Sequence, residues 1–237
     1  MNRILHAILI AAAIIFSSCA APEKSKEKLP YTVGEILLSD DFSGNSATWE
    51  AEGQSPELVD GKMVIDTNSF AAVWLKPALL GNIVIEYDVT VLSQNSSDKT
   101  QCSFGCFAMA SDPADTKNFF AGSKERAGTL SGYDNLNLYY YYLSCDSKNS
   151  AKFMKYSNGK HESIGTSAES SYKISPDKKY HVKLLFFKNT IEFYLNDRRL
   201  LKYEGSSPYT EGNFGFTALV CKIAVDNFSI THLRQFK

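Results

Sequence analysis

The stretch YHVKLLFFKNTIEFYLNDRRLLKY, residues 180–203, decides the fold class of this 237-residue chain. It holds three short runs rich in aromatic, β-branched and leucine residues, at 180–187, 190–195 and 199–203. Such runs are typical of strands, and Asn196-Asp197 between the last two is a hairpin-type turn signal. The stretch therefore predicts consecutive strands joined by tight turns.

Short strand candidates continue on both sides of this stretch. Residues 83–92 alternate apolar and polar side chains, as a half-buried strand does. The other candidates lie at 37–42, 57–59, 62–66, 73–75, 101–110, 136–143, 152–156, 213–220 and 223–230. The one helix candidate is a turn near 112–118. About a dozen short strands with Gly, Asn, Asp and Ser between them predict an all-β fold, a single β-sandwich domain of two antiparallel sheets over residues 37–233.

Composition and charge exclude several classes of protein. Hydrophobic residues make up 44% of the chain and charged residues 22%, which excludes a disordered chain, a collagen and a coiled coil. The 25 basic and 26 acidic residues give a net charge of −1. Because a basic surplus for phosphate contacts is lacking, we expect no nucleic-acid partner. Aromatic residues reach 13%, which suits stacking against the apolar faces of sugar rings.

The N-terminal residues resemble a bacterial lipoprotein signal. A basic start precedes an apolar run at 4–16 that is too short to span a bilayer comfortably. The sequence FSSC at 16–19 then places small residues before a cysteine, as in a lipobox. We expect a signal peptide at 1–18, lipidation of Cys19 and a flexible tether within 19–36. This predicts a lipid anchor in the bacterial cell envelope, at the outer membrane; a plain signal peptide cleaved elsewhere is the alternative.

Four further cysteines fall within the predicted domain. In an extended strand, Cys102 and Cys106 lie about 13 Å apart, at ~3.3 Å per residue, which is too far for a disulfide between them. Each can pair with Cys145 or Cys221, because disulfides persist in the cell envelope. Alternatively, the four thiols stay reduced as small core residues. The sequence has no CxxC motif, and its histidines are scattered, which argues against a zinc site.

The order of several motifs resembles a known superfamily. The motifs are DDFSG at 40–44, DGKMVID at 60–66, GTLSGYDNLNLYY at 128–140, PYTEGNFGF at 208–216 and VDNFSI at 225–230. Together they resemble the concanavalin A-like lectin/glucanase superfamily. More narrowly, they resemble a poorly characterised domain family of bacterial lipoproteins, a domain of unknown function of polysaccharide-utilisation systems. The resemblance implies a jelly-roll sandwich and a carbohydrate partner.

Some positions depart from the pattern of the narrower family. The family resemblance leads us to expect two arginines at Lys152 and Met154, and an asparagine at Gly105. It also leads us to expect an arginine and a histidine where the chain has Thr217 and Lys222. If those positions carry catalysis in relatives, their replacement here favours binding over catalysis.

A run of tyrosines and asparagines is the strongest candidate for a ligand site. Alternate residues of a strand share one face, which would place five of these side chains together. Amides and aromatic rings match the hydroxyls and C–H faces of sugars. A second strand would add Lys152 and Tyr156 as its hairpin neighbour. The predicted ligand-binding residues are Tyr133, Asn135, Asn137, Tyr139, Tyr141, Lys152 and Tyr156. A tyrosine ladder that only stabilises cross-strand pairs is the alternative.

The sequence leaves other functions open. A polysaccharide lyase or glycoside hydrolase would use Tyr133 or Tyr139 with Lys152, and Glu86 and Asp88 are a second possible acid pair, about 6.6 Å apart along a strand. A structural envelope lipoprotein is the third hypothesis.

Aspartates near both ends of the domain suggest one possible metal site. A jelly roll brings its chain ends together, so Asp40, Asp41 and Asp226 could hold a structural Ca²⁺. Turn capping by aspartate is the alternative, and we expect no other cofactor.

Overall fold

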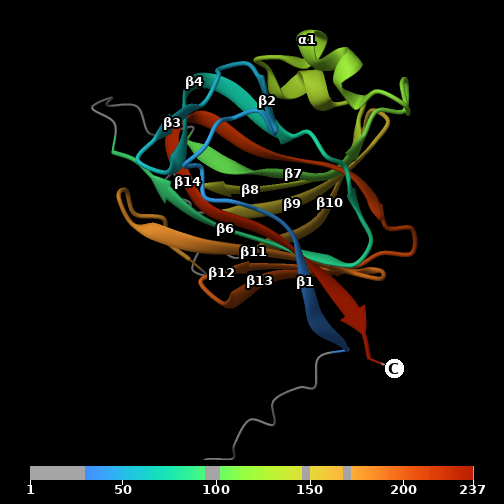
Figure 1. The fold of residues 1–237 in the computed structure, drawn as a ribbon. Coiled ribbons are helices and arrows are strands. Elements are labelled where there is room, and N and C mark those ends of the chain that lie inside the picture. The colour runs from blue at the N-terminus through green and yellow to red at the C-terminus, as the bar shows by residue number, and fades with distance from the viewer. Residues whose placement is uncertain (1–29, 94–101, 146–149, 168–171, 237) are drawn as a thin grey trace, which may run out of the picture. The chain divides into compact units, whose positions relative to one another are not determined.

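Strand β14 (Glu211–Gln235) is the longest element and pairs with five other strands, β1, β4, β5, β6 and β7. The computed structural model describes residues 30–93, 102–145, 150–167 and 172–236. Those residues form two antiparallel layers that share β14 (Figure 1). The predicted all-β sandwich is confirmed.

The upper sheet in Figure 1 is built on the first half of β14. From there it runs through β7 (Ser103–Ser111), β8 (Asn137–Ser144), β9 (Ala151–Ser157) and β10 (Lys160–Ser167). On its other side lie the second half of β4 (Lys62–Leu75) and β2 (Trp49–Glu52). The short strand β5 (Leu79–Leu80) pairs with the start of β14.

The lower sheet is built on the second half of β14. It continues through β6 (Ile83–Val91), β11 (Lys179–Phe187), β12 (Thr190–Leu195) and β13 (Arg198–Glu204). On the other side of β14 lie the first half of β4 and then β1 (Tyr31–Asp40). The short strand β3 (Glu57–Val59) pairs with β4.

A bulge lets β4 and β14 pass from one sheet to the other. Leu219 pairs with Phe70, but the next pair joins Cys221 to Thr67, so two residues of β4 oppose Val220 alone. Val220 has a positive φ of 47°. Such bulges bend a strand and increase its twist, which turns both strands at the corner between the two sheets.

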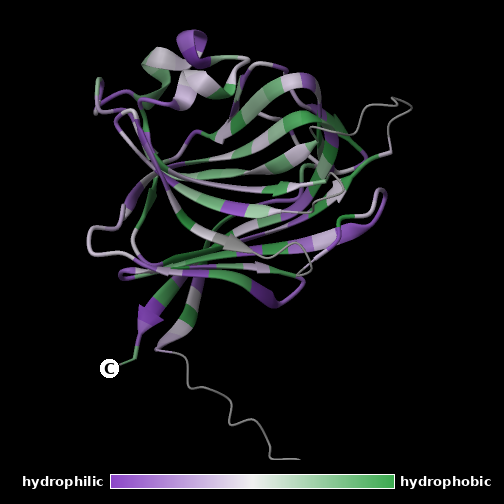
Figure 2. Cartoon of the chain, turned by 180° about the vertical axis from the view of Figure 1, so that it is seen from behind, coloured by the Kyte–Doolittle hydropathy of each residue, from purple (hydrophilic) through white to green (hydrophobic). Residues whose placement is uncertain are grey.

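Large aromatic side chains fill the space between the sheets. Phe104, Phe153, Phe193 and Phe214 come from both layers and are at most 2% exposed. Hydrophobic and hydrophilic residues alternate along many strands, as Figure 2 shows, because one face of each strand packs inward. This alternation is the signal that made the strands predictable.

Most of the predicted strands form, but β4 and β14 are each one strand where the sequence predicted two, and β2 and β5 were not predicted. Residues 180–203 form β11, β12 and β13 as expected. However, β1 begins at Tyr31, inside the predicted tether, and β14 continues to Gln235. Strand β10 was not predicted. The predicted signal peptide and Cys19 lie outside the described residues.

The four domain cysteines, all of which are described, form no disulfide. Cys106 and Cys221 are buried, and the Cys221 thiol donates a hydrogen bond to the Ser103 carbonyl oxygen at 3.2 Å. Burial raises the pKa of Cys106 to about 12, so this thiol stays protonated. Of the two alternatives that the sequence left open, the structure therefore matches the second, cysteines as small core residues.

Candidate functional site

Residues 112–136, which we call the capping segment, lie on the outer face of the upper sheet, at the top of Figure 1. They contain η1 (Phe119–Gly122), α1 (Ser123–Arg126) and η2 (Leu130–Tyr133). An aromatic cluster joins the segment to the sheet. The Tyr133 ring lies 4.9 Å from that of Phe107, and the Phe119 ring packs edge-on against Trp74 at 4.8 Å. The capping segment therefore covers an apolar patch of the sheet.

A buried ion pair fixes the capping segment over β2. The Arg126 Nη2 atom lies 2.7 Å from Glu52 Oε1, and the two side chains are only 5% and 0% exposed. Arg126 also donates to the Phe119 carbonyl oxygen at 2.9 Å and approaches Asp112 at 3.4 Å. A buried charge is tolerated only when it is paired and hydrogen-bonded. The position of Asp112 and Phe119 thus depends on this pair.

We expect Glu52→Gln to lower the free energy of unfolding by about 3–5 kcal/mol, because it removes the closer and more deeply buried of the two carboxylates that pair with Arg126. Glu50→Gln is the matched control on the same strand. Glu50 pairs with Lys76 at 3.5 Å, and both side chains are nearly half exposed, so its loss should cost about 0–1 kcal/mol. Urea unfolding of both variants measures the difference. Equal losses would show that the buried pair has no special role.

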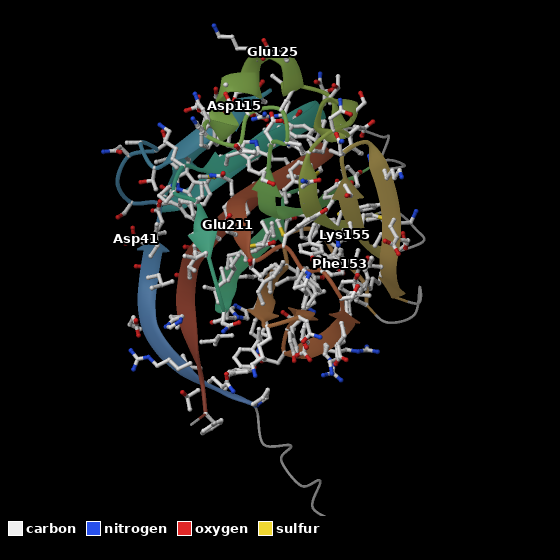
Figure 3. The ribbon with its side chains drawn as sticks, turned by 90° about the vertical axis from the view of Figure 1, so that its right-hand side faces the viewer. Asp41, Asp115, Glu125, Phe153, Lys155 and Glu211 are labelled. Carbon is white, nitrogen blue, oxygen red and sulfur yellow. The ribbon has the colours of Figure 1, made fainter. Side chains whose placement is uncertain are left out.

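A cavity of about 720 Å³ opens beside the capping segment. Three loops form it: the start of the capping segment, the β4–β5 connection and the entry to β14. Its lining includes two aromatic side chains, three carboxylates and one buried amide, namely Phe119, Tyr209, Asp112, Asp115, Glu211 and Asn213. Figure 3 labels Asp115 on the capping segment and Glu211 at the start of β14. We take this cavity as the candidate functional site because a concave site with converging polar groups is the usual form of a ligand pocket.

Hydrogen bonds hold several lining side chains in place. Asp115 accepts from the backbone N–H groups of Lys117 and Asn118 at 3.1 and 3.0 Å. The Asn213 amide, 5% exposed, donates to two carbonyl oxygens at the end of β4. Groups that are fixed before a ligand arrives lose less entropy when it binds.

Tyr209 is anchored from the neighbouring strands. Its backbone N–H donates to the Tyr139 hydroxyl at 3.1 Å, and its own hydroxyl donates to the Tyr156 carbonyl oxygen at 2.9 Å. The Lys155 ammonium lies 4.8 Å from the centre of the Tyr209 ring. The loop that enters β14 is therefore tied to β8 and β9.

The predicted tyrosine and asparagine face does not exist as one surface. Tyr139 and Tyr141 are 0% and 1% exposed and pack in the core between the sheets. Tyr133 is 0% exposed and belongs to η2, because β8 begins only at Asn137. The prediction was wrong because it assigned the odd residues of β8 outward. It is Tyr140 and Tyr142 that face outward, under and beside the capping segment.

The remaining predicted residues are scattered. Asn135 is exposed in the turn before β8, and Asn137 is half-buried. Lys152 is exposed on β9, opposite Tyr142. Tyr156 is 5% exposed and stacks on the His161 ring at 3.8 Å. None of these side chains lines the cavity.

Sequence reasoning missed the cavity residues, although weak signals existed. The motif at 208–216 was one of the more specific parts of the family resemblance, and it contains Tyr209 and Glu211. The turn near 112–118 was noted only as a helix candidate, yet it supplies Asp112 and Asp115.

The three aspartates proposed for Ca²⁺ have other roles. Asp40 accepts hydrogen bonds from the Trp49 indole and the Phe42 backbone, both at 2.8 Å. Asp41 accepts from Ser43, and Asp226 accepts from the Asn227 backbone at 2.7 Å. Within the described ranges, no group of three or more histidine, cysteine or acidic side chains could hold a metal ion. The Ca²⁺ prediction is therefore corrected to turn capping.

Glu86 and Asp88 lie on the lower sheet, away from the cavity, and both approach His181. The His181 Nδ1 atom lies 2.9 Å from Asp88 Oδ1, and its Nε2 atom 3.5 Å from Glu86 Oε1. Asp88 also contacts Lys179 at 3.0 Å and accepts from Asn227 at 2.9 Å. Burial alone would raise the pKa of Asp88, but the hydrogen bonds from its neighbours outweigh it and hold the pKa below its usual value.

The lowered pKa of Asp88 predicts a pH-dependent contribution to stability. A carboxyl group with a depressed folded-state pKa stabilises the fold above its unfolded pKa, and loses this contribution as pH falls through the folded value. We expect Asp88→Asn to cost about 1–3 kcal/mol at pH 7, from lost hydrogen bonds to a charged group. The difference should shrink below about pH 4, near the unfolded pKa of aspartate.

The measurement is denaturant unfolding of wild type and variant between pH 7 and pH 3. Asp197→Asn is the control, because its side chain is 90% exposed. A difference for Asp88→Asn that persists unchanged at pH 3 would contradict the assignment.

Two sequence comparisons bear on the chain. A family model described as "Domain of unknown function (DUF6250)" matches residues 65–228, which is more than half of the chain. The matched range holds every cavity residue described above. No curated protein matches the chain.

Solved structures share the fold at low sequence identity. A Bacillus subtilis protein of unknown function with a galectin-like fold has a TM-score of 0.70 at 17% identity, over 87% of this chain and 100% of that one. The carbohydrate-binding module CBM66 from Bacillus subtilis has a TM-score of 0.57 at 17% identity, over 77% and 94%. A Bacillus licheniformis β-glucanase has a TM-score of 0.58 at 9% identity, over 84% and 98%. These likenesses confirm the predicted jelly-roll fold.

Proposed function

We propose that this chain, which belongs to the DUF6250 family of domains of unknown function, binds a carbohydrate in the 720 Å³ cavity beside the capping segment. The observation that carries the proposal is that Asp115, Glu211 and Tyr209 line one concave site. Carboxylates accept hydrogen bonds from sugar hydroxyls, and aromatic rings cover the apolar faces of sugars.

The charge of the cavity narrows the class of carbohydrate. Three carboxylates line it, and Asp112 alone is paired with a buried arginine. Like charges repel in a partly buried site, so a neutral oligosaccharide fits better than one that carries uronates or sulfates. The volume falls within the range of small-molecule pockets, about 300–1,000 Å³, which suits a few sugar units.

The fold supports the proposal without deciding it. One structural neighbour is by its name a carbohydrate-binding module, and another is a glucanase. A fold hosts many functions, so the argument depends on the site itself.

We expect Glu211→Gln to weaken binding of a neutral oligosaccharide about tenfold or more, because hydrogen bonds to a charged acceptor contribute about 1.5–3 kcal/mol. The Glu211 side chain is exposed and has no hydrogen bond among the described residues, while its backbone pairing with Leu80 does not depend on the side chain, so the fold should be unaffected. Glu204→Gln, on β13 and outside the cavity, is the matched control. Calorimetry with ligands from a glycan panel gives the affinities. Equal affinities of the two variants would place the ligand elsewhere.

A hydrolytic activity is the second candidate, and the same cavity favours it. Glycosidases usually act with a pair of carboxyl groups, and the cavity offers Asp115 and Glu211 besides the arginine-paired Asp112. The lyase or hydrolase hypothesis built on Tyr133 or Tyr139 is corrected, because both side chains are buried. Assaying the panel for new reducing or unsaturated ends separates the candidates. Products support an enzyme, and retention without products supports a binding protein.

We further propose that Cys19 carries a lipid that anchors the domain in the cell envelope, at the outer membrane, as an accessory to polysaccharide utilisation. The lipobox-like FSSC sequence supports this proposal. In the described part of the chain, no helix is both long and apolar enough to cross a membrane. If the panel yields neither retention nor products, a structural envelope lipoprotein becomes the better hypothesis.

Cys19→Ala should abolish the partitioning of the protein into the detergent phase, because it removes the only proposed acylation site. The control is Cys145→Ala, which changes a half-buried cysteine of the domain. Retention of Cys19→Ala in the detergent phase would exclude the lipid anchor.

A further inference from the structure

The first strand and the last residues of the chain form a projecting apolar ribbon. β1 and the end of β14 pair from Tyr31 opposite Gln235 to Asp40 opposite Phe228. The ribbon extends below the lower sheet in Figure 1, at the opposite end from the capping segment. Six large hydrophobic side chains are exposed in the described residues, and four of them are on this ribbon: Val33, Ile36, Leu37 and Phe236. Their exposed fractions are 69%, 65%, 52% and 45%.

The exposed side chains continue an apolar cluster on the outer face of the lower sheet. Val33 lies opposite Leu233, and Ile36 opposite Thr231. Opposite residues in an antiparallel pair project to the same side, so Val33 and Ile36 share the side of Leu233. There Leu233 packs with Val84, Leu185 and Phe187, and Tyr31 covers the edge of this cluster. The ribbon thus presents an apolar face that continues the packed cluster around Leu233.

We propose that this ribbon docks on the surface of the lipid bilayer, with Val33 and Ile36 in the interface. The inference rests on the proposed lipidation of Cys19. Eleven residues lie between Cys19 and Tyr31, and a flexible linker of that length would span about 20 Å. The lipid would therefore hold the ribbon close to the bilayer, where exposed apolar side chains lower their free energy by entering the interface.

One nearby basic side chain and the position of the capping segment agree with this orientation. Lys188 is exposed with its ammonium 5.6 Å from the centre of the Phe187 ring, beside the apolar face, where it can meet lipid phosphates. Arg234 lies on the ribbon and pairs with Glu35. With the ribbon on the bilayer, the capping segment, which carries Asp115 of the cavity lining, lies at the end of the domain away from the membrane (Figures 1 and 3). A glycan could then reach the cavity.

Quenching by brominated lipids tests the proposal in the full, lipidated protein. Ile36→Trp places a reporter on the ribbon, and Val59→Trp is the matched control on β3, where the native side chain is 46% exposed. The native Trp49 and Trp74 are buried and give a constant background. The proteins are bound to phosphatidylcholine–phosphatidylglycerol vesicles with and without brominated acyl chains. We expect the Ile36→Trp reporter to lose roughly half of its added emission, because interfacial groups lie ~5–10 Å into the headgroup and acyl boundary. The Val59→Trp reporter should lose almost none.

Each other result overturns the docking proposal in a distinguishable way. If the protein floats with the vesicles but Ile36→Trp is not quenched, the anchor stands and the ribbon is solvated. Equal quenching of both reporters indicates unspecific adsorption. If the protein does not float with the vesicles, both the docking proposal and the lipid anchor are refuted. Carbohydrate binding in the cavity is then still tested separately by glycan retention. If the Ile36→Trp emission is blue-shifted without vesicles and sedimentation shows a dimer, the ribbon is an interface with a second copy of the chain rather than with lipid.

Discussion

The paired strands β4 and β14, which belong to both sheets, are the constraint on which the rest of the structure depends. Their shared bulge at Val220 fixes where one layer ends and the other begins. β7 pairs with the first half of β14, and β6 pairs with the second half. The capping segment follows the end of β7, and the first residues of β14 form one wall of the cavity. The position of the cavity is therefore a consequence of a single strand pairing, with loops attached to its ends.

A charged pair in an apolar setting completes the site. Glu52 and Arg126 are buried, and the Arg126 guanidinium lies 4.6 Å from the centre of the Phe119 ring, which itself packs on Trp74; an unpaired charge in this setting would be strongly unfavourable. Apolar contacts alone allow small sliding of a covering segment, whereas the directional contacts of the guanidinium group permit one position. The pair thus contributes specificity of placement to the capping segment, and through Asp112 and Phe119 this placement extends to the cavity wall.

Local alternation explains both what the sequence predicted and what it did not. Residues 83–91 and 180–203 form the expected strands because one face of each is apolar and the spacing is unambiguous. The run LYYYYL in β8 has apolar side chains on both faces, because the capping segment covers the outer face. The local sequence therefore does not show which alternate residues face the core. Glu52 and Arg126 lie 74 residues apart, and the cavity joins three distant loops. Such contacts depend on strand order, which no local pattern specifies.

The separation of the ribbon from the cavity has a physical consequence for function. The ribbon contains the end of β14, whereas the cavity lies at the start of the same strand, near Glu211 and Asn213. Among the described strands, β14 is the only one that contributes to both. A partner bound at the ribbon therefore touches no side chain that lines the cavity. Attachment to a surface and recognition of a ligand would then use different side chains of one small domain, because the ribbon and the cavity lie at opposite ends of β14.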